Sequence, residues 1–103
     1  MAARADQFAA LVARHPENEM FRFSFAQALL AENRSAEAVP HLEACATKKA
    51  DWMMPRILLG KALLGLRQAT EARRWLDEAL QLAVLQHHET PEQELRAMLA
   101  ELG

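Results

Sequence analysis

Apolar residues recur along the chain at the three- and four-residue spacing of amphipathic helices, with short polar interruptions between them. The interruptions fall at 15–18, 32–35, 48–51, 65–69 and 87–91. The windows between them are rich in Ala, Leu, Glu, Arg and Gln, which favour helix, and three glycines and four prolines are too few for a loop-rich β protein. The pattern predicts an all-α chain of about six helices. The expected N-terminal caps are Asn18, Ser35, Asp51 and Thr90.

The sequence also repeats itself at a fixed offset, the one that separates Met20 from Met54. Identical residues at this offset are Met20, Arg22, Ala28, Leu29, Leu30, Glu37, Ala38 and Leu42, which return as Met54, Arg56, Ala62, Leu63, Leu64, Glu71, Ala72 and Leu76. A fixed period of this length is typical of stacked helical units and not of a catalytic fold.

Other positions in the repeat keep their size and not their identity. Ala26 returns as Gly60, and Cys45 returns as Ala79, so small residues stay small. Two helices cross closely only where one presents a small residue and the other fills the space with a large one. The repeated unit is therefore predicted to be a helical hairpin, with Ala26 and Gly60 buried where its helices cross.

These residues resemble the tetratricopeptide repeat family. In the first helix of its unit, the family has a large residue, then Gly or Ala, then a large residue three positions further on. The matching residues are Phe25, Ala26 and Leu29 in one unit and Leu59, Gly60 and Leu63 in the next. In the second helix, the family's small, large and small positions match Ala38, Leu42 and Cys45, and then Ala72, Leu76 and Ala79. The chain departs from the family where Arg22 and Arg56 replace the usual aromatic residue.

The resemblance implies a right-handed superhelical stack of antiparallel helical hairpins in one domain, 1–103. It divides that domain into an unpaired N-terminal helix, two repeats and a capping helix, at 3–15, 19–49, 53–86 and 90–102. The stripe of Leu95, Met98, Leu99 and Leu102 on the last helix is expected to cover the hairpin that ends near Ala83, because an array otherwise leaves its final stacking face in water.

Composition and charge exclude several functions. With 12 basic and 14 acidic side chains in mixed order, no single-sign surface is expected to attract nucleic acid or an anionic membrane. The stretch that begins the sequence contains Arg4, Asp6 and Arg14, and so lacks the continuous apolar run of a signal peptide or a membrane span. Cys45 is the one cysteine, which excludes an internal disulfide and favours a cytoplasmic location.

Candidates for chemistry are few. His41 and Cys45 are four residues apart on one predicted helix, a spacing that metals use, but the sequence positions no further pair of ligands near them. His87 and His88 are adjacent and so point in different directions. The chain has no glycine-rich phosphate loop, nucleophile elbow or paired His-Glu metal motif. We therefore expect no catalysis, no metal and no cofactor.

The first helix of each repeat is apolar on more sides than packing against its own partner requires. The surplus face has Met20, Phe23, Ser24, Gln27, Leu30 and Ala31 in the first repeat, and Met54, Ile57, Leu58, Lys61, Leu64 and Gly65 in the second. In the family, this side lines the concave groove that binds peptides or helices of partner proteins. We expect Phe23, Leu30, Ile57 and Leu64 to contribute to binding more than to the core.

The resemblance implies a non-catalytic protein-interaction module. The groove offers Phe23, Gln27, Leu58 and Lys61, and so favours an apolar segment over the acidic tails that some family members bind. The alternative is self-association. Two full hairpins fall short of the three repeats that such arrays usually need, so a second copy of the chain is a further candidate to cover the groove.

Overall fold

The computed structural model describes residues 4–102, and within them the chain forms six helices and no strand. The helices are α1 (Arg4–Arg14), α2 (Glu19–Ala31), α3 (Ser35–Lys48), α4 (Met53–Gly65), α5 (Ala69–Leu85) and α6 (Glu89–Leu102). The all-α prediction is confirmed for these residues. The expected start of the first helix at residue 3 lies outside them.

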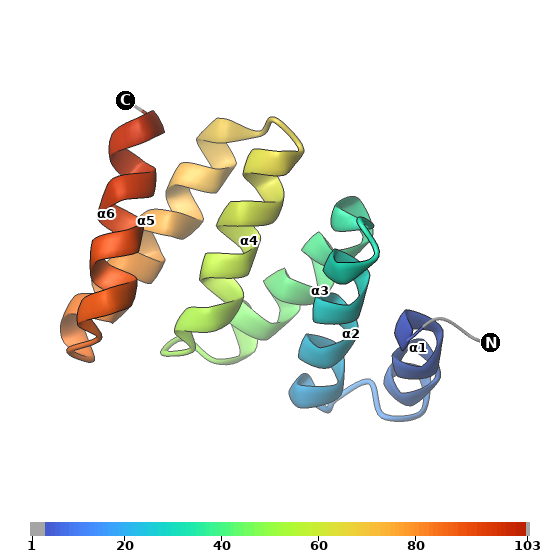
Figure 1. Cartoon of the computed structure of the whole chain (residues 1–103). Coiled ribbons are helices and arrows are strands. Elements are labelled where there is room, and N and C mark those ends of the chain that lie inside the picture. The colour runs from blue at the N-terminus through green and yellow to red at the C-terminus, as the bar shows by residue number, and fades with distance from the viewer. Residues whose placement is uncertain (1–3, 103) are drawn as a thin grey trace.

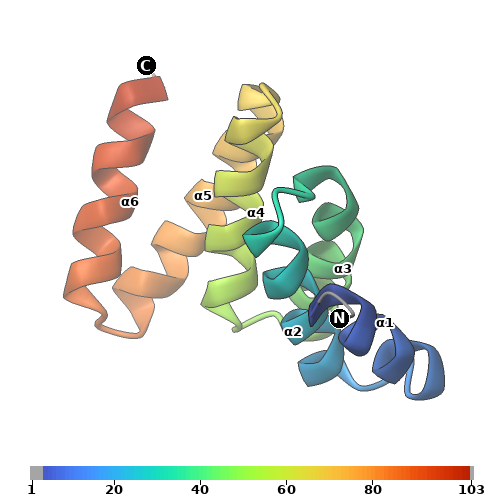
Figure 2. The ribbon, with the colours of Figure 1, turned by 45° about the vertical axis from the view of Figure 1, so that its right-hand side comes forward.

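Each helix packs mainly against the helices that precede and follow it in the sequence. The molecule is elongated, with extents of 41 × 26 × 20 Å, and its two ends lie at opposite ends of the row of helices (Figure 1). Turned by 45°, the ribbon again runs from α1 at one end to α6 at the other (Figure 2). Residues far apart in the sequence therefore meet chiefly where one helix covers its neighbour.

Three of the five turns have the same geometry. Asn33, Arg67 and His87 adopt positive φ angles of 61°, 61° and 57° directly after α2, α4 and α5. The next backbone amide then donates back to a carbonyl of the last helical turn: Arg34 N to Leu29 O at 2.9 Å, Gln68 N to Leu63 O at 2.8 Å and His88 N to Ala83 O at 2.9 Å. This arrangement pairs carbonyls that a helix end leaves free and reverses the chain in a short turn. Asn33 and Arg67 are separated by the same offset as Met20 and Met54, so the backbone repeats with the sequence.

One predicted cap is confirmed and three are wrong. The Asn18 side chain accepts a hydrogen bond from the backbone amide of Phe21 at 3.0 Å, which caps α2. The caps of α3 and α4 are instead Arg34 and Trp52, neither with a capping side-chain bond, and α6 begins at Glu89, before Thr90. For α3 and α6 the reason is the preceding turn, because the amide that returns to the previous helix belongs to Arg34 or His88, the residue directly before the new helix.

The crossing within the second hairpin depends on a missing side chain. A Cβ added at Gly60 would stand 2.5 Å from Cγ of Leu76 and closer still to its Cδ2. Leu76 is fully buried, so it occupies the space that a larger residue at position 60 would need. Ala26, the counterpart of Gly60, is also fully buried. The predicted burial of both small residues is confirmed.

The last helix covers the second hairpin. Leu95 is buried in a cluster with Ala83, Leu76 and Ile57, and the half-buried Met98, Leu99 and Leu102 pack against the same cluster. The predicted contact of the apolar stripe with the region of Ala83 is confirmed. α6 therefore removes from water a face that α5 would otherwise expose.

Candidate interaction surface

The residues of the predicted binding surface differ widely in exposure. Met20 is 53% exposed and Met54 is 42% exposed, two of the largest apolar exposures among the described residues. Gln27 and Lys61 are exposed, whereas Leu30, Leu58 and Leu64 are half-buried. Beyond the two methionines, the predicted binding surface is therefore polar at Gln27 and Lys61 and partly covered at its leucines.

Phe23 and Ile57 lie in the hydrophobic core, so the expectation that they serve binding more than packing is wrong. Phe23 is 9% exposed, and its ring centroid lies 4.8 Å from that of Trp52, which precedes α4. Ile57 is also 9% exposed and packs in the cluster that Leu95 of α6 completes. In both cases a neighbouring element covers the surplus face.

The structure does not bring the predicted residues together around one cavity. Gln27, Ser24 and Ala31 line a cavity of about 240 Å³ together with Arg4 and Phe8 of α1. Met20 lies at the other end of α2 and lines different cavities. This face of α2 therefore borders more than one cavity.

Met20 lines two cavities, and the one that it shares with Trp52 is the candidate binding site. It measures about 530 Å³ and is lined by Met20, Lys49, Asp51, Trp52 and Gln86. The Gln86 side-chain amide donates to the Asp51 carbonyl oxygen at 2.8 Å, which ties the end of α5 to the turn before α4. Exposed Met20 and half-buried Trp52 give this site a thioether and an aromatic ring that an apolar side chain can contact.

Lys49, which lines this cavity, already forms an ion pair with Glu19. Glu19 forms ion pairs with Lys48 at 3.3 Å and Lys49 at 3.2 Å, and the Lys49 ammonium also lies 5.5 Å from the centre of the Trp52 ring. A hydrogen bond from the backbone amide of Glu19 itself and bonds from both lysines lower the pKa of the Glu19 carboxyl to about 2. The carboxylate is therefore charged at any physiological pH.

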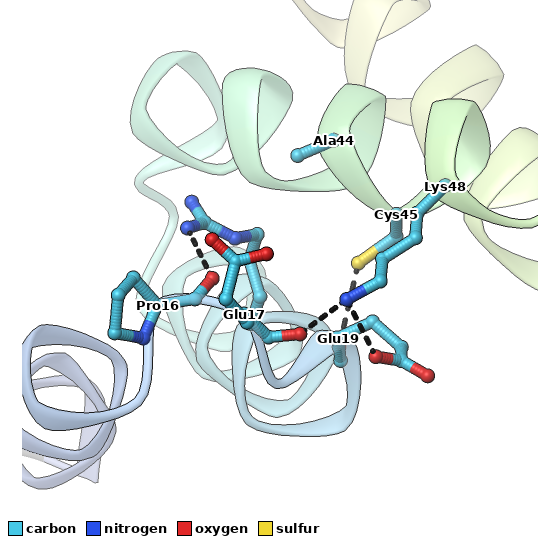
Figure 3. Close-up of a pocket in the computed structure, with 7 residues that line it drawn as sticks. Pro16, Glu17, Glu19, Ala44, Cys45 and Lys48 are labelled. Carbon is cyan, nitrogen blue, oxygen red and sulfur yellow. Dashed lines mark hydrogen bonds and ion pairs between the residues drawn. The ribbon is translucent and has the colours of Figure 1, made fainter.

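A further cavity, of about 300 Å³, lies between the start of α2 and α3. Figure 3 shows Lys48 reaching from α3 towards the Glu17 carbonyl oxygen and the Glu19 carboxylate, with the Cys45 thiol beside it. The Cys45 Sγ lies 3.5 Å from the Glu19 carbonyl oxygen, and burial raises the pKa of the thiol to about 11. Cys45 is thus a protonated packing residue and not an activated nucleophile.

Two features that bear on function are lacking in the part of the chain that the structure describes. No group of three or more His, Cys, Asp or Glu side chains there is placed to hold a metal ion. Among residues 4–102, none of the helices has both the length and the apolar character needed to cross a membrane.

The sequence prediction missed Lys49, Asp51, Trp52 and Gln86. All four lie in turns or at helix ends, where helical periodicity carries no information. One signal was available, because Trp52 is one of only two tryptophans in the chain and stands beside a predicted helix start. Large aromatic residues near a surface are frequent at binding sites.

Comparisons with known proteins bear on the fold alone. No protein-family model matches the chain, and no curated protein matches it significantly. Among solved structures, the chain is similar to the solution structure of protein BPP2914 from Bordetella parapertussis, which was a structural-genomics target. The superposition has a TM-score of 0.81 at 24% identity and covers 99% of this chain and 89% of that one. At this identity the likeness establishes a shared helical fold, and the name states no function.

Proposed function

We propose that this chain is a non-catalytic protein-interaction module built from two tetratricopeptide-like repeats, between an N-terminal helix and a capping helix. The proposal is supported by one period shared by the side chains and the turns, with Asn33 and Arg67 in the same left-handed conformation. In this interpretation the six helices form a right-handed stack of hairpins. Its functional part is a surface that binds an apolar peptide or helix of a partner protein.

The observation that carries the proposal is the exposure of Met20 and Met54. They occupy the same position in the two repeats, the second residue of α2 and of α4, and each leaves a large apolar side chain in water. Methionine is flexible and polarisable, and it adapts to apolar ligands of different shape. The cavity beside Trp52 adjoins Met20 and is large enough for one such side chain of the partner.

Selection from a random peptide library displayed on phage tests the proposal, with binding of the selected peptides measured by calorimetry. We expect peptides with large apolar residues to be selected, and the double variant Met20→Ser with Met54→Ser to lose their binding. Because both methionines are exposed, the melting temperature of this variant should stay close to that of the parent.

The matched control is Val84→Ser with Leu85→Ser, which removes two other exposed large apolar side chains at the end of α5. It should retain the peptides. The proposal fails if no peptide is selected, or if both double variants bind the selected peptides as tightly as the parent does.

Self-association is the second candidate, and one observation favours it. Leu85 is 73% exposed, the largest such value among the described large apolar residues, and it is the last residue of α5, which has 17 residues where α3 has 14. An apolar side chain of this kind is often covered in an oligomer. Sedimentation equilibrium over a range of concentrations distinguishes the two candidates, since a dimer of the parent that disappears in the Val84→Ser and Leu85→Ser variant supports this alternative.

A further inference from the structure

His41 accepts a hydrogen bond from an arginine. Its Nδ1 lies 3.1 Å from Nη1 of Arg22, and because a guanidinium only donates, the imidazole nitrogen must be the acceptor. This fixes the ring as neutral, with its hydrogen on Nε2. The other terminal nitrogen, Nη2, donates to the carbonyl oxygen of Pro16 at 3.0 Å. A single guanidinium thus joins α3 to the turn between α1 and α2.

The second hairpin has the same pair without the titratable ring. Arg56 and Trp75 occupy in the second repeat the positions of Arg22 and His41, and the Arg56 guanidinium lies 5.9 Å from the centre of a Trp75 ring. Arg56 likewise donates to the carbonyl oxygens of Lys49 and Trp52 in the preceding turn, at 3.2 and 2.8 Å. An indole does not change its charge with pH, whereas an imidazole does. At this position of the repeat, only the first hairpin has an imidazole beside its arginine.

The surroundings of His41 disfavour its charged form. The ring is half-buried, its centroid lies 4.6 Å from that of Phe25, and desolvation followed by the positive charge of Arg22 lowers its pKa below the ordinary value of 6.5. Both neighbours belong to α2.

Other charged groups near these helices are engaged elsewhere. Glu37, one turn before His41 on α3, pairs with Arg34, and Glu19 of α2 pairs with Lys48 and Lys49. Glu17, in the turn after α1, lines the same cavity as Arg22, but no ion pair joins Arg22 to a carboxylate within residues 4–102. From α4, the Arg56 guanidinium donates to the carbonyl oxygen of Ala46, near the C-terminal end of α3. Arg22 is thus the charge that directly meets the ring.

We propose that protonation of His41 in mildly acidic solution releases Arg22 from α3 and loosens the turn between α1 and α2. A protonated Nδ1 cannot accept from the guanidinium, and two cations at hydrogen-bond distance repel each other. The folded chain binds the proton more weakly than the unfolded chain. The stability that the contact contributes is therefore fully present above pH 6.5 and is lost as the pH falls below that value through the lower pKa of the folded state.

The first test is an NMR titration of the four histidine rings from about pH 7.5 to about pH 5, the range in which imidazoles change charge. We expect His41 to titrate below the ordinary imidazole value. Replacing Arg22 by Ala should raise the pKa of His41, because it removes a neighbouring positive charge. A His41 pKa at or above the ordinary value, or one that Arg22→Ala leaves unchanged, overturns the proposal.

The second test measures amide hydrogen exchange in the segment 15–18 over the same range, corrected for the intrinsic effect of pH. Exchange should rise several-fold on acidification in the parent and stay constant in His41→Gln, whose amide oxygen can still accept from Arg22 without titrating. His15 lies in this turn, so all chains in this test also contain His15→Gln. Equal acid-induced exchange in the chains with His41 and with Gln at this position overturns the proposal, as does the absence of any rise in the parent.

Discussion

The α2–α3 hairpin and the α4–α5 hairpin begin their second helices at equivalent positions of the repeat, Ser35 and Ala69, and close with turns of the same geometry. Their helix crossings nevertheless differ. In the first hairpin the small residue is Ala26, and in the second it is Gly60, where Leu76 occupies the space of a Cβ. The two hairpins thus have different side chains at their crossings, and at Gly60 a Cβ fits only if Leu76 moves.

The arginines at equivalent positions also differ in how much they hold together. Arg56 is 7% exposed, donates to the carbonyl oxygens of Ala46, Lys49 and Trp52, and pairs with Glu78 of α5 at 3.1 Å. It joins α3, α4 and α5. Arg22 is half-buried and makes two hydrogen bonds, one to the His41 ring nitrogen and one to the Pro16 carbonyl oxygen. The comparison teaches that the same residue of the repeat has a larger structural role where it is more enclosed.

The largest effect is expected from deleting residues 90–103, which removes the cover of the second hairpin only. Replacing the buried Leu95 by Ala alone is expected to cost about 2–5 kcal/mol, and the deletion exposes the rest of the cluster as well. Thermal unfolding and light scattering should show a lower melting temperature or aggregation. Glu94→Ala, on an exposed side of α6, should have little effect. A truncated chain as stable and as monomeric as the parent would contradict the role of α6.

The second effect concerns the helix crossing. Gly60→Leu should cost more than about 2 kcal/mol in urea unfolding, because the added side chain overlaps Leu76. This loss is expected although leucine is the better helix former by about 1 kcal/mol. Gly65→Ala is the control, since a Cβ at Gly65 meets nothing within 4 Å, and it should stabilise the helix slightly. A neutral Gly60→Leu variant would contradict the close contact of position 60 with Leu76.

The smallest of the three effects separates the two arginines. Arg56→Met should cost about 2–3 kcal/mol, because it leaves buried carbonyl groups and Glu78 without their donor. Arg22→Met should cost about 1 kcal/mol, as expected for fewer and more exposed bonds. Both values are measured by urea unfolding at one neutral pH, so that His41 stays uncharged. Equal costs would remove the distinction between the hairpins.

Helix number and the two small crossing residues could be predicted because both depend on local spacing. The helical period identifies a helix, and the repeated small residue identifies where another helix must come close. The apolar stripe of α6 follows the same logic, and its contact with the region of Ala83 is confirmed. The caps were predicted less well, because the turn before α3 and the turn before α6 each determine where the next helix begins.

The binding surface could be predicted only in part. Met20 and Met54 are exposed at their repeated position, but Phe23 and Ile57 share that face and are buried. Helical periodicity tells which residues share a side of one helix, and it carries no information about what a neighbouring element places over that side. Trp52 over Phe23 and α6 over Ile57 are such neighbours.

The sequence by itself determined the helices, the repeated unit and the close contact at Gly60, since these follow from residue size and spacing along single helices. Only the tertiary structure decided which apolar residues remain in water, which arginine becomes buried, and that His41 meets Arg22. The physical reason is that burial and hydrogen bonding depend on atoms supplied by other helices and turns. Those atoms reach their positions only when the whole chain has packed.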